Sequence, residues 1–126
     1  MTLNCDFCGK DLLRPEPHGI YCMDLNKHCR YAYVCCKGEC DRQLRKPYGN
    51  DVIGWEDISD LPSPNVWVCR WMAITNRMVT LGETYEPDAY SKLRDLFAAT
   101  FQYVHRPLTK WDQERFDTEL LLRNVG

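Results

Sequence analysis

The sequence contains no long apolar run and no leader-like start. None of its hydrophobic stretches approaches the roughly 20 residues that a membrane-spanning helix needs. The first five residues, Met-Thr-Leu-Asn-Cys, lack the charged segment followed by an apolar segment that marks a signal peptide. These absences predict a cytoplasmic protein without a membrane partner.

A strong excess of one charge is also absent. The 126 residues include 16 Lys+Arg and 18 Asp+Glu, which gives a formal net charge of −2. A global basic field that attracts nucleic acid is therefore excluded. The chain also lacks a Ser/His/Asp set, a glycine-rich phosphate loop and a paired-carboxylate motif. We therefore expect a protein that is not an enzyme.

Cysteine is abundant for a chain of this length. There are eight cysteines, and only Cys69 follows residue 46. In a reducing compartment, closely spaced cysteines bind metal more often than they form disulfides. The front of the chain is therefore predicted to bind a metal ion.

Two cysteine pairs have the spacing of a structural zinc site. Cys5 and Cys8 form a C-x2-C pair followed by Gly9, which permits the positive φ that ends a tight turn. Cys36 and Cys40 form a C-x3-C pair at the predicted start of a short helix, where the helix dipole favours thiolates. A lone C-x2-C pair is also a redox motif, but the βαβ setting of such a motif is missing here. We predict that these four cysteines bind one structural Zn²⁺.

The two segments that carry these cysteines resemble a known zinc-finger family. Residues 5–9 (CDFCG) and 33–40 (YVCCKGEC) are similar to the TRASH/FCS group of treble-clef fingers, over about residues 3–46. The resemblance implies a knuckle, a β-hairpin and a helix start around one zinc ion. It departs at Cys35, where the family usually has Phe, and at Lys37, where it has Ser. Such fingers are linked to metal handling, protein docking and regulation.

The remaining cysteines of the front part leave several interpretations open. A hairpin with its turn at residues 24–27 would place Cys22 directly opposite Cys29. The two are interpreted as packed thiols, as part of a second metal site that recruits His18 or His28, or as an oxidisable pair. Cys35 lies next to Cys36 on a predicted strand and therefore points to the opposite face, where we expect a buried thiol.

The sequence predicts an α+β fold. Its composition divides the chain into three parts. Residues 1–46 are predicted to form the zinc module, residues 47–64 a proline- and glycine-rich linker, and residues 65–126 a helical region. The apolar periodicity and the positions of Pro and Gly predict three helices, which begin at the last residue of the linker and continue through the helical region. These helices run from Pro64 to about residue 81, from Pro87 or Asp88 to about residue 104, and from Thr109 to about Arg123.

A zinc ion held by four thiolates has no open position for water, so this centre is expected to be structural. We interpret the chain as a non-enzymatic interaction module, a small adaptor or regulator that binds another protein. One alternative is a nucleic-acid-binding, transcription-regulator-like finger, and another is a metal sensor or metallochaperone. Strong chelation is expected to unfold the front half while the helices persist. The nucleic-acid alternative would use a basic edge formed by Lys27, Arg30, Arg42, Arg45 and Lys46.

Overall fold

The centre of the fold is a three-stranded antiparallel sheet. The computed structural model describes residues 2–104, 110, 113–114 and 117–118. Strand β1 (Ile20–Asp24) lies between β3 (Ala32–Cys35) and β4 (Ile53–Asp57), so β3 and β4 form the two edges. A separate two-stranded parallel sheet joins β2 (His28–Cys29) to β5 (Thr84–Tyr85).

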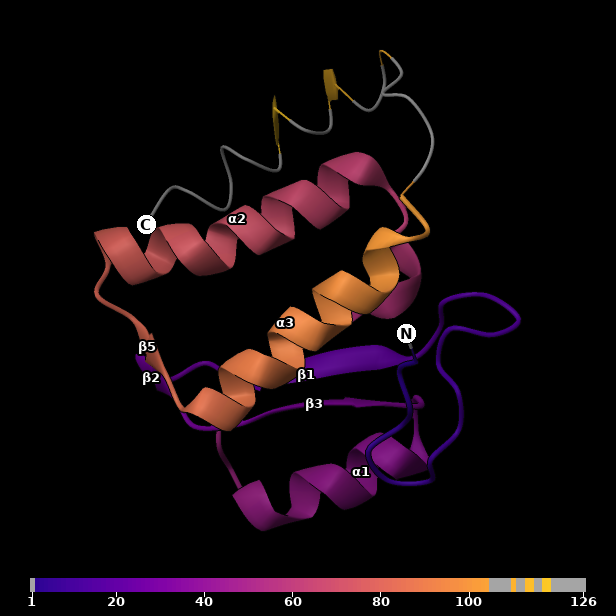
Figure 1. The fold of residues 1–126 in the computed structure, drawn as a ribbon. Coiled ribbons are helices and arrows are strands. Elements are labelled where there is room, and N and C mark those ends of the chain that lie inside the picture. Colours follow the sequence, from indigo (N-terminus) through magenta and orange to yellow (C-terminus); the bar gives the residue numbers. More distant parts are fainter. Residues whose placement is uncertain (1, 105–109, 111–112, 115–116, 119–126) are drawn as a thin grey trace.

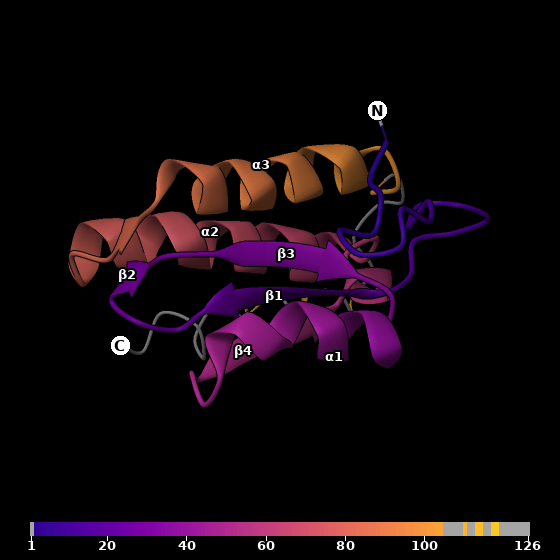
Figure 2. The same cartoon turned by 90° about the horizontal axis from the view of Figure 1, so that it is seen from below.

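Helices cover both faces of the central sheet. The short helix α1 (Glu39–Arg45) lies on one face, and α2 (Pro64–Thr80) and α3 (Pro87–Phe101) lie on the other (Figure 1, Figure 2). The alternation of side chains along β1 sets this division, because neighbouring residues of a strand point to opposite faces. Cys22 faces α1, whereas Tyr21 reaches α3 through a ring contact with Phe97. The α+β class predicted from the sequence is confirmed.

One hydrophobic core joins the front and the back of the chain. Leu12 from the N-terminal segment and Val34 from β3 belong to the same buried cluster as Leu93 and Phe97 from α3. Trp67 and Trp71 of α2 pack against the ring of Phe97, with centroid distances of 5.7 and 5.2 Å. The predicted zinc module and the predicted helical region therefore share their interior.

The prediction of a linker at residues 47–64 is wrong for its middle part. Residues 53–57 form β4, which pairs with β1 over five residues, and Ile58 and Leu61 just after it are fully buried. The turn signals are real but flank the strand. Pro47 lies in a short 3-10 turn (Lys46–Tyr48), and a second such turn (Ile58–Asp60) leads into α2. Pairing with β1, which is not local in sequence, gives this stretch its strand conformation.

The predicted starts of the two long helices are confirmed. Ser63 occupies the N-cap of α2 with Pro64 as the first helical residue, and α3 begins at Pro87. Gly82, with φ of 65°, follows the C-cap of α2, whereas α3 ends at Phe101, a few residues before the predicted end. The helix predicted from Thr109 to about Arg123 falls largely outside the described residues. No described helix has the length and apolarity to cross a membrane.

Gly19 allows the N-terminal segment to approach the sheet closely. Its φ is +84°, and a Cβ at this position would lie 2.5 Å from the carbonyl oxygen of Cys35. We expect Gly19→Ala to lower the free energy of unfolding by about 2–3 kcal/mol, through backbone strain plus steric overlap. Gly49→Ala is the matched control, because its φ is +57° but nothing lies within 4 Å of the added Cβ. Equal losses in the two variants, measured by urea unfolding, would contradict the steric part of this prediction.

Candidate metal centre

The first cysteine pair lies in a tight turn near the N-terminus. The N–H of Cys5 donates to the carbonyl of Lys10 at 2.8 Å, and the N–H of Gly9 donates back to the carbonyl of Cys5 at 3.0 Å. Gly9 has a φ of 80°, the left-handed conformation that the sequence predicted for it. The turn directs both thiols of the pair to the same side.

The second pair comes from the junction between β3 and α1. Cys36 directly follows β3, and Cys40 is the second residue of α1. Gly38 lies between them at the helix N-cap with a φ of 84°, and its carbonyl accepts the N–H of Arg42. The chain thereby reverses within three residues and brings both thiols to one side. The sequence predicted a short helix that starts at the second pair, and in the structure Cys40 lies within that helix whereas Cys36 precedes it.

The four thiols converge. The sulfur atoms of Cys5, Cys8, Cys36 and Cys40 all lie within 4.8 Å of one another. Cys8 Sγ and Cys36 Sγ are 3.8 Å apart. A tetrahedral site with Zn–S bonds of about 2.3 Å has its sulfurs about 3.8 Å apart. The donor set therefore has the composition and the spacing of a tetrathiolate metal site, and it could bind an ion such as zinc.

Backbone amides favour the ionised form of one of these thiols. The Sγ of Cys5 accepts N–H groups from Phe7, Cys8 and Cys36, each at 3.4 Å. Burial alone would raise the pKa of Cys5, but these hydrogen bonds outweigh it and lower the pKa to about 6. Three amides from two distant segments thus favour a thiolate at Cys5.

Cys36 and Cys40 resist ionisation beside this thiolate. Partial burial and the neighbouring sulfurs of Cys8 and Cys5 raise the pKa of Cys40 to about 12. Burial and the same two neighbours also raise the pKa of Cys36. Like charges this close cannot all persist without compensation. A divalent cation at the centre supplies that compensation, so the thiol chemistry fits a metal ion.

Asp6 connects the first cysteine turn to the rest of the fold. Its N–H donates to the carbonyl of Val34, and its Oδ2 accepts the N–H of Val34, both at 2.8 Å. Its Oδ1 accepts a hydrogen bond from Lys92 Nζ of α3 at 2.7 Å. Asp6, one of the two residues between Cys5 and Cys8, therefore fixes the turn to β3 and to α3.

Comparison with protein-family models, with curated proteins and with solved structures gives no match to this chain. The candidate metal centre is therefore interpreted from its own residues. The cluster of four cysteines is established by the structure, whereas the TRASH/FCS type implied by the resemblance has no further support from these comparisons.

The expected pairing of Cys22 with Cys29 is wrong. Cys22 lies opposite Tyr33 in the β1–β3 register, and its thiol donates to Asp41 Oδ1 of α1 at 3.7 Å. The Cys29 thiol donates to the carbonyl of Tyr31 at 3.4 Å. The turn after β1 is longer than predicted, because residues 28–29 leave the hairpin to pair with β5.

No second metal site forms within the described part of the chain. There, the only group of three or more candidate ligands with mutually close donor atoms is the four-cysteine cluster. His18 Nδ1 contacts the carbonyl of Glu16 at 2.8 Å, and His28 contacts Thr84 and Glu86 through its two ring nitrogens. Cys35 is fully buried, as expected, and all eight cysteines are free thiols.

The basic residues proposed as a nucleic-acid edge are largely paired with carboxylates. Arg30 contacts Asp24 at 2.7 Å and Asp51 at 2.8 Å. Arg42 pairs with Glu39, and Arg45 pairs with Asp41 at 3.4 Å, in both cases within α1. Local acidic groups thus neutralise three of the five predicted cations. The other two are Lys27, in the connection between β1 and β2, and Lys46, directly after α1.

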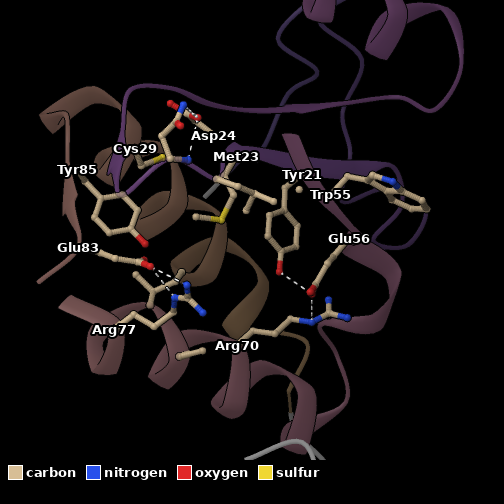
Figure 3. Close-up of a pocket in the computed structure, with 15 residues that line it drawn as sticks. Tyr21, Met23, Asp24, Cys29, Trp55, Glu56, Arg70, Arg77, Glu83 and Tyr85 are labelled. Atoms are coloured by element: carbon tan, nitrogen blue, oxygen red, sulfur yellow. Dashed lines mark hydrogen bonds and ion pairs between the residues drawn. The ribbon is translucent and has the colours of Figure 1, made fainter. Parts of the chain in front are cut away.

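A cavity of about 590 Å³ between the sheet and α2 was not predicted from the sequence. Arg70 pairs with Glu56 at one end, where Tyr21 also donates to Glu56 (Figure 3). Arg77 donates to Glu83 through Nε and Nη2 at 2.9 and 2.7 Å at the other end. The seven-residue separation of the two arginines on α2 was the available signal, because it places both on one helix face. Their glutamate partners come from other elements and could not be assigned from local sequence.

Proposed function

We propose that this protein is a zinc-stabilised, non-enzymatic interaction module that binds another protein. The observation that carries this proposal is the closed set of four sulfurs within 4.8 Å of one another. Such a set fills the coordination shell of Zn²⁺ and leaves no position for a reacting water. The zinc ion then has a structural role, and the exposed surface of the module carries the function.

The proposal includes a treble-clef arrangement of the ligands. A tight turn supplies Cys5 and Cys8, the paired strands β1 and β3 follow, and the start of α1 supplies Cys40. This order of knuckle, hairpin and helix supports the resemblance to the TRASH/FCS fingers. A nucleic-acid-binding role has less support, because most of the predicted basic edge is already paired with carboxylates.

Metal content tests the proposal. We expect one zinc ion per chain in the protein purified under reducing conditions, measured by elemental analysis. Cys36→Ser removes one of four ligands, and we expect it to retain less than about a tenth of this zinc, in line with the loss that weakened metal sites show. Cys29→Ala is the matched control, since it removes a buried cysteine outside the cluster and should retain the metal.

Two outcomes would contradict the proposal. Wild-type protein without bound metal would remove its basis, as would equal metal loss in Cys36→Ser and Cys29→Ala. The metal-sensor alternative predicts an exchangeable ion. Zinc that survives prolonged dialysis against a mild chelator favours the structural role over that alternative.

A further inference from the structure

The cavity between the central sheet and α2 differs at its two ends. At one end, Arg70 pairs with Glu56, and Glu56 also accepts a hydrogen bond from the Tyr21 hydroxyl at 3.1 Å. Arg70 donates further to the backbone carbonyl of Asp57 at 3.3 Å. The polar groups at this end bond one another, so they form a closed wall of the cavity.

The other end of the cavity keeps polar atoms that the protein does not use. Arg77 donates to Glu83 through Nε and Nη2, and both bonds go to the same oxygen, Oε2. Among the described residues, no hydrogen-bond partner lies at Arg77 Nη1, at Glu83 Oε1 or at the Tyr85 hydroxyl. Figure 3 shows the Tyr85 hydroxyl directed toward the Arg77–Glu83 pair. Two donor groups and one acceptor therefore stand at this end of the cavity.

The Tyr85 hydroxyl is a donor at neutral pH. Burial and the nearby carboxylate of Glu83 raise the pKa of Tyr85 to about 12, so the phenol keeps its proton. The side chain of Glu83 is only 17% exposed. Polar groups that are shielded from water gain most from a ligand that supplies the missing hydrogen bonds.

The pairing of charges in the cavity disfavours an ionic ligand. Arg70 and Arg77 each have a glutamate partner, so neither end presents a net charge to a ligand. A carboxylate or an ammonium group placed there would lose its hydration without gaining a free counter-ion. A neutral carboxamide satisfies the open atoms instead. Its N–H donates to Glu83 Oε1, and its carbonyl accepts from the Tyr85 hydroxyl or from Arg77 Nη1.

Apolar surface separates the two ends. Met23, Ala73, Ile74 and the ring of Tyr21 line this middle part of the cavity. Methionine adapts its shape to its neighbours and packs favourably against aromatic rings. The volume of about 590 Å³ falls within the range of pockets that hold small molecules, about 300–1,000 Å³. The walls therefore suit a flat apolar body.

We propose that this cavity binds a neutral small molecule with an aromatic body and a carboxamide head. The head lies at the Arg77–Glu83 end, beside the Tyr85 hydroxyl, and the body packs against Met23 and Ile74. This binding function goes beyond the proposed protein-binding role and does not depend on it.

Three naphthalene derivatives with the same ring system test the proposal. The probes are 2-naphthamide, 2-naphthoate and 2-naphthylmethylammonium, whose head groups are neutral, negative and positive at pH 7. Binding to the metal-loaded full chain is measured by equilibrium dialysis. We expect saturable binding of one amide per chain, at least tenfold tighter than the binding of either charged analogue.

Matched variants locate the amide on the protein. We expect Tyr85→Phe to weaken amide binding about three- to tenfold, the effect of one lost hydrogen bond. Tyr48→Phe is its control, because Tyr48 stacks on Tyr31 and does not line the cavity. Ala73→Phe fills the middle of the cavity and should weaken binding at least tenfold. Val79→Phe adds the same ring at a position of α2 that is 85% exposed, and it should bind like the wild type.

Three results overturn the inference. The first is the absence of saturable amide binding, or equal binding of the amide and a charged analogue. The second is an equal effect of Tyr85→Phe and Tyr48→Phe, and the third is equal affinity of Ala73→Phe and Val79→Phe. Circular dichroism and zinc content report the fold of each variant. Tyr85→Phe keeps the aromatic ring, so it tests the site even where the larger side chain of Ala73→Phe disturbs the fold.

Discussion

Removal of the proposed zinc ion is expected to unfold the helices together with the cysteine-rich part. The sequence alone favoured unfolding of the front half with persistence of the helices. The shared core changes this expectation, because Leu3, Leu12 and Leu13 of the N-terminal segment belong to the same buried cluster as Leu93 and Phe97 of α3. Loss of the cysteine turn exposes one side of α3 and removes its contacts.

Specific polar contacts reinforce this coupling. Lys92 of α3 donates to Asp6 between the ligand cysteines, and the Tyr103 hydroxyl donates to the carbonyl of Leu13 at 3.3 Å. Structural zinc contributes about 10–16 kcal/mol in small zinc-binding modules. This is comparable to the whole stability of a domain, which is about 5–15 kcal/mol. The apoprotein should therefore lack enough stability to keep the helices folded.

Far-UV circular dichroism during titration with a strong chelator measures this effect. We expect the helical signal and the near-UV tryptophan signal to fall in a single transition that excess zinc reverses, in the presence of a reductant that keeps the cysteines free. Retention of most helical signal after complete zinc removal would show that α2 and α3 are stable without the metal centre, contrary to this prediction.

The four clustered cysteines and the helix starts were predictable because their signals are local. The C-x2-C and C-x3-C spacings restrict each cysteine pair to a turn, and Pro64 and Pro87 mark the first helical residues. The convergence of the two cysteine pairs is not local, but the chemistry of Zn²⁺ requires four ligands, and these pairs had the spacing that structural zinc sites use. Local geometry and donor chemistry together therefore sufficed for the candidate site.

The path of the chain after β1 was not predictable in the same way. A short hairpin with Cys22 opposite Cys29 is locally reasonable, but β2 pairs with β5, which lies about 55 residues further along the chain. The strand β4 was missed for a similar reason, because its partner β1 lies about 30 residues before it. Both errors concern pairings between segments distant in sequence, which residue patterns within either segment do not encode.

Asp24 organises this longer connection from a buried position. Its side chain is fully buried and accepts four hydrogen bonds. Oδ1 accepts the backbone N–H and the side-chain amide of Asn26, and Oδ2 accepts the backbone N–H of Arg30 and its Nε, the latter at 2.7 Å. Burial would raise the pKa of Asp24, but the hydrogen bonds from Arg30 and Asn26 lower it below the ordinary value of 3.8. The connection from β1 to β2 is therefore built around an ionised carboxylate.

Asp24→Ala is expected to lower the free energy of unfolding by about 1–3 kcal/mol, because it removes the acceptor of four hydrogen bonds, two of them from Arg30. Urea unfolding of the zinc-loaded protein at pH 7 measures this loss. A depressed pKa in the folded state means that the stabilisation is complete at pH values above the unfolded pKa and declines as the pH falls through the folded pKa. Neutral pH therefore reports the full effect.

Asp51→Ala is the matched control, because Asp51 pairs with the same Arg30 at 2.8 Å from a partly exposed position. Water and salt screen such a pair, so we expect it to contribute less than about 1 kcal/mol. A similar loss in both variants would mean that the Arg30 ion pairs, and not the buried hydrogen bonds of Asp24, stabilise the connection. A loss confined to Asp24→Ala shows that the buried carboxylate holds residues 24–30 in the conformation that allows β2 to pair with β5.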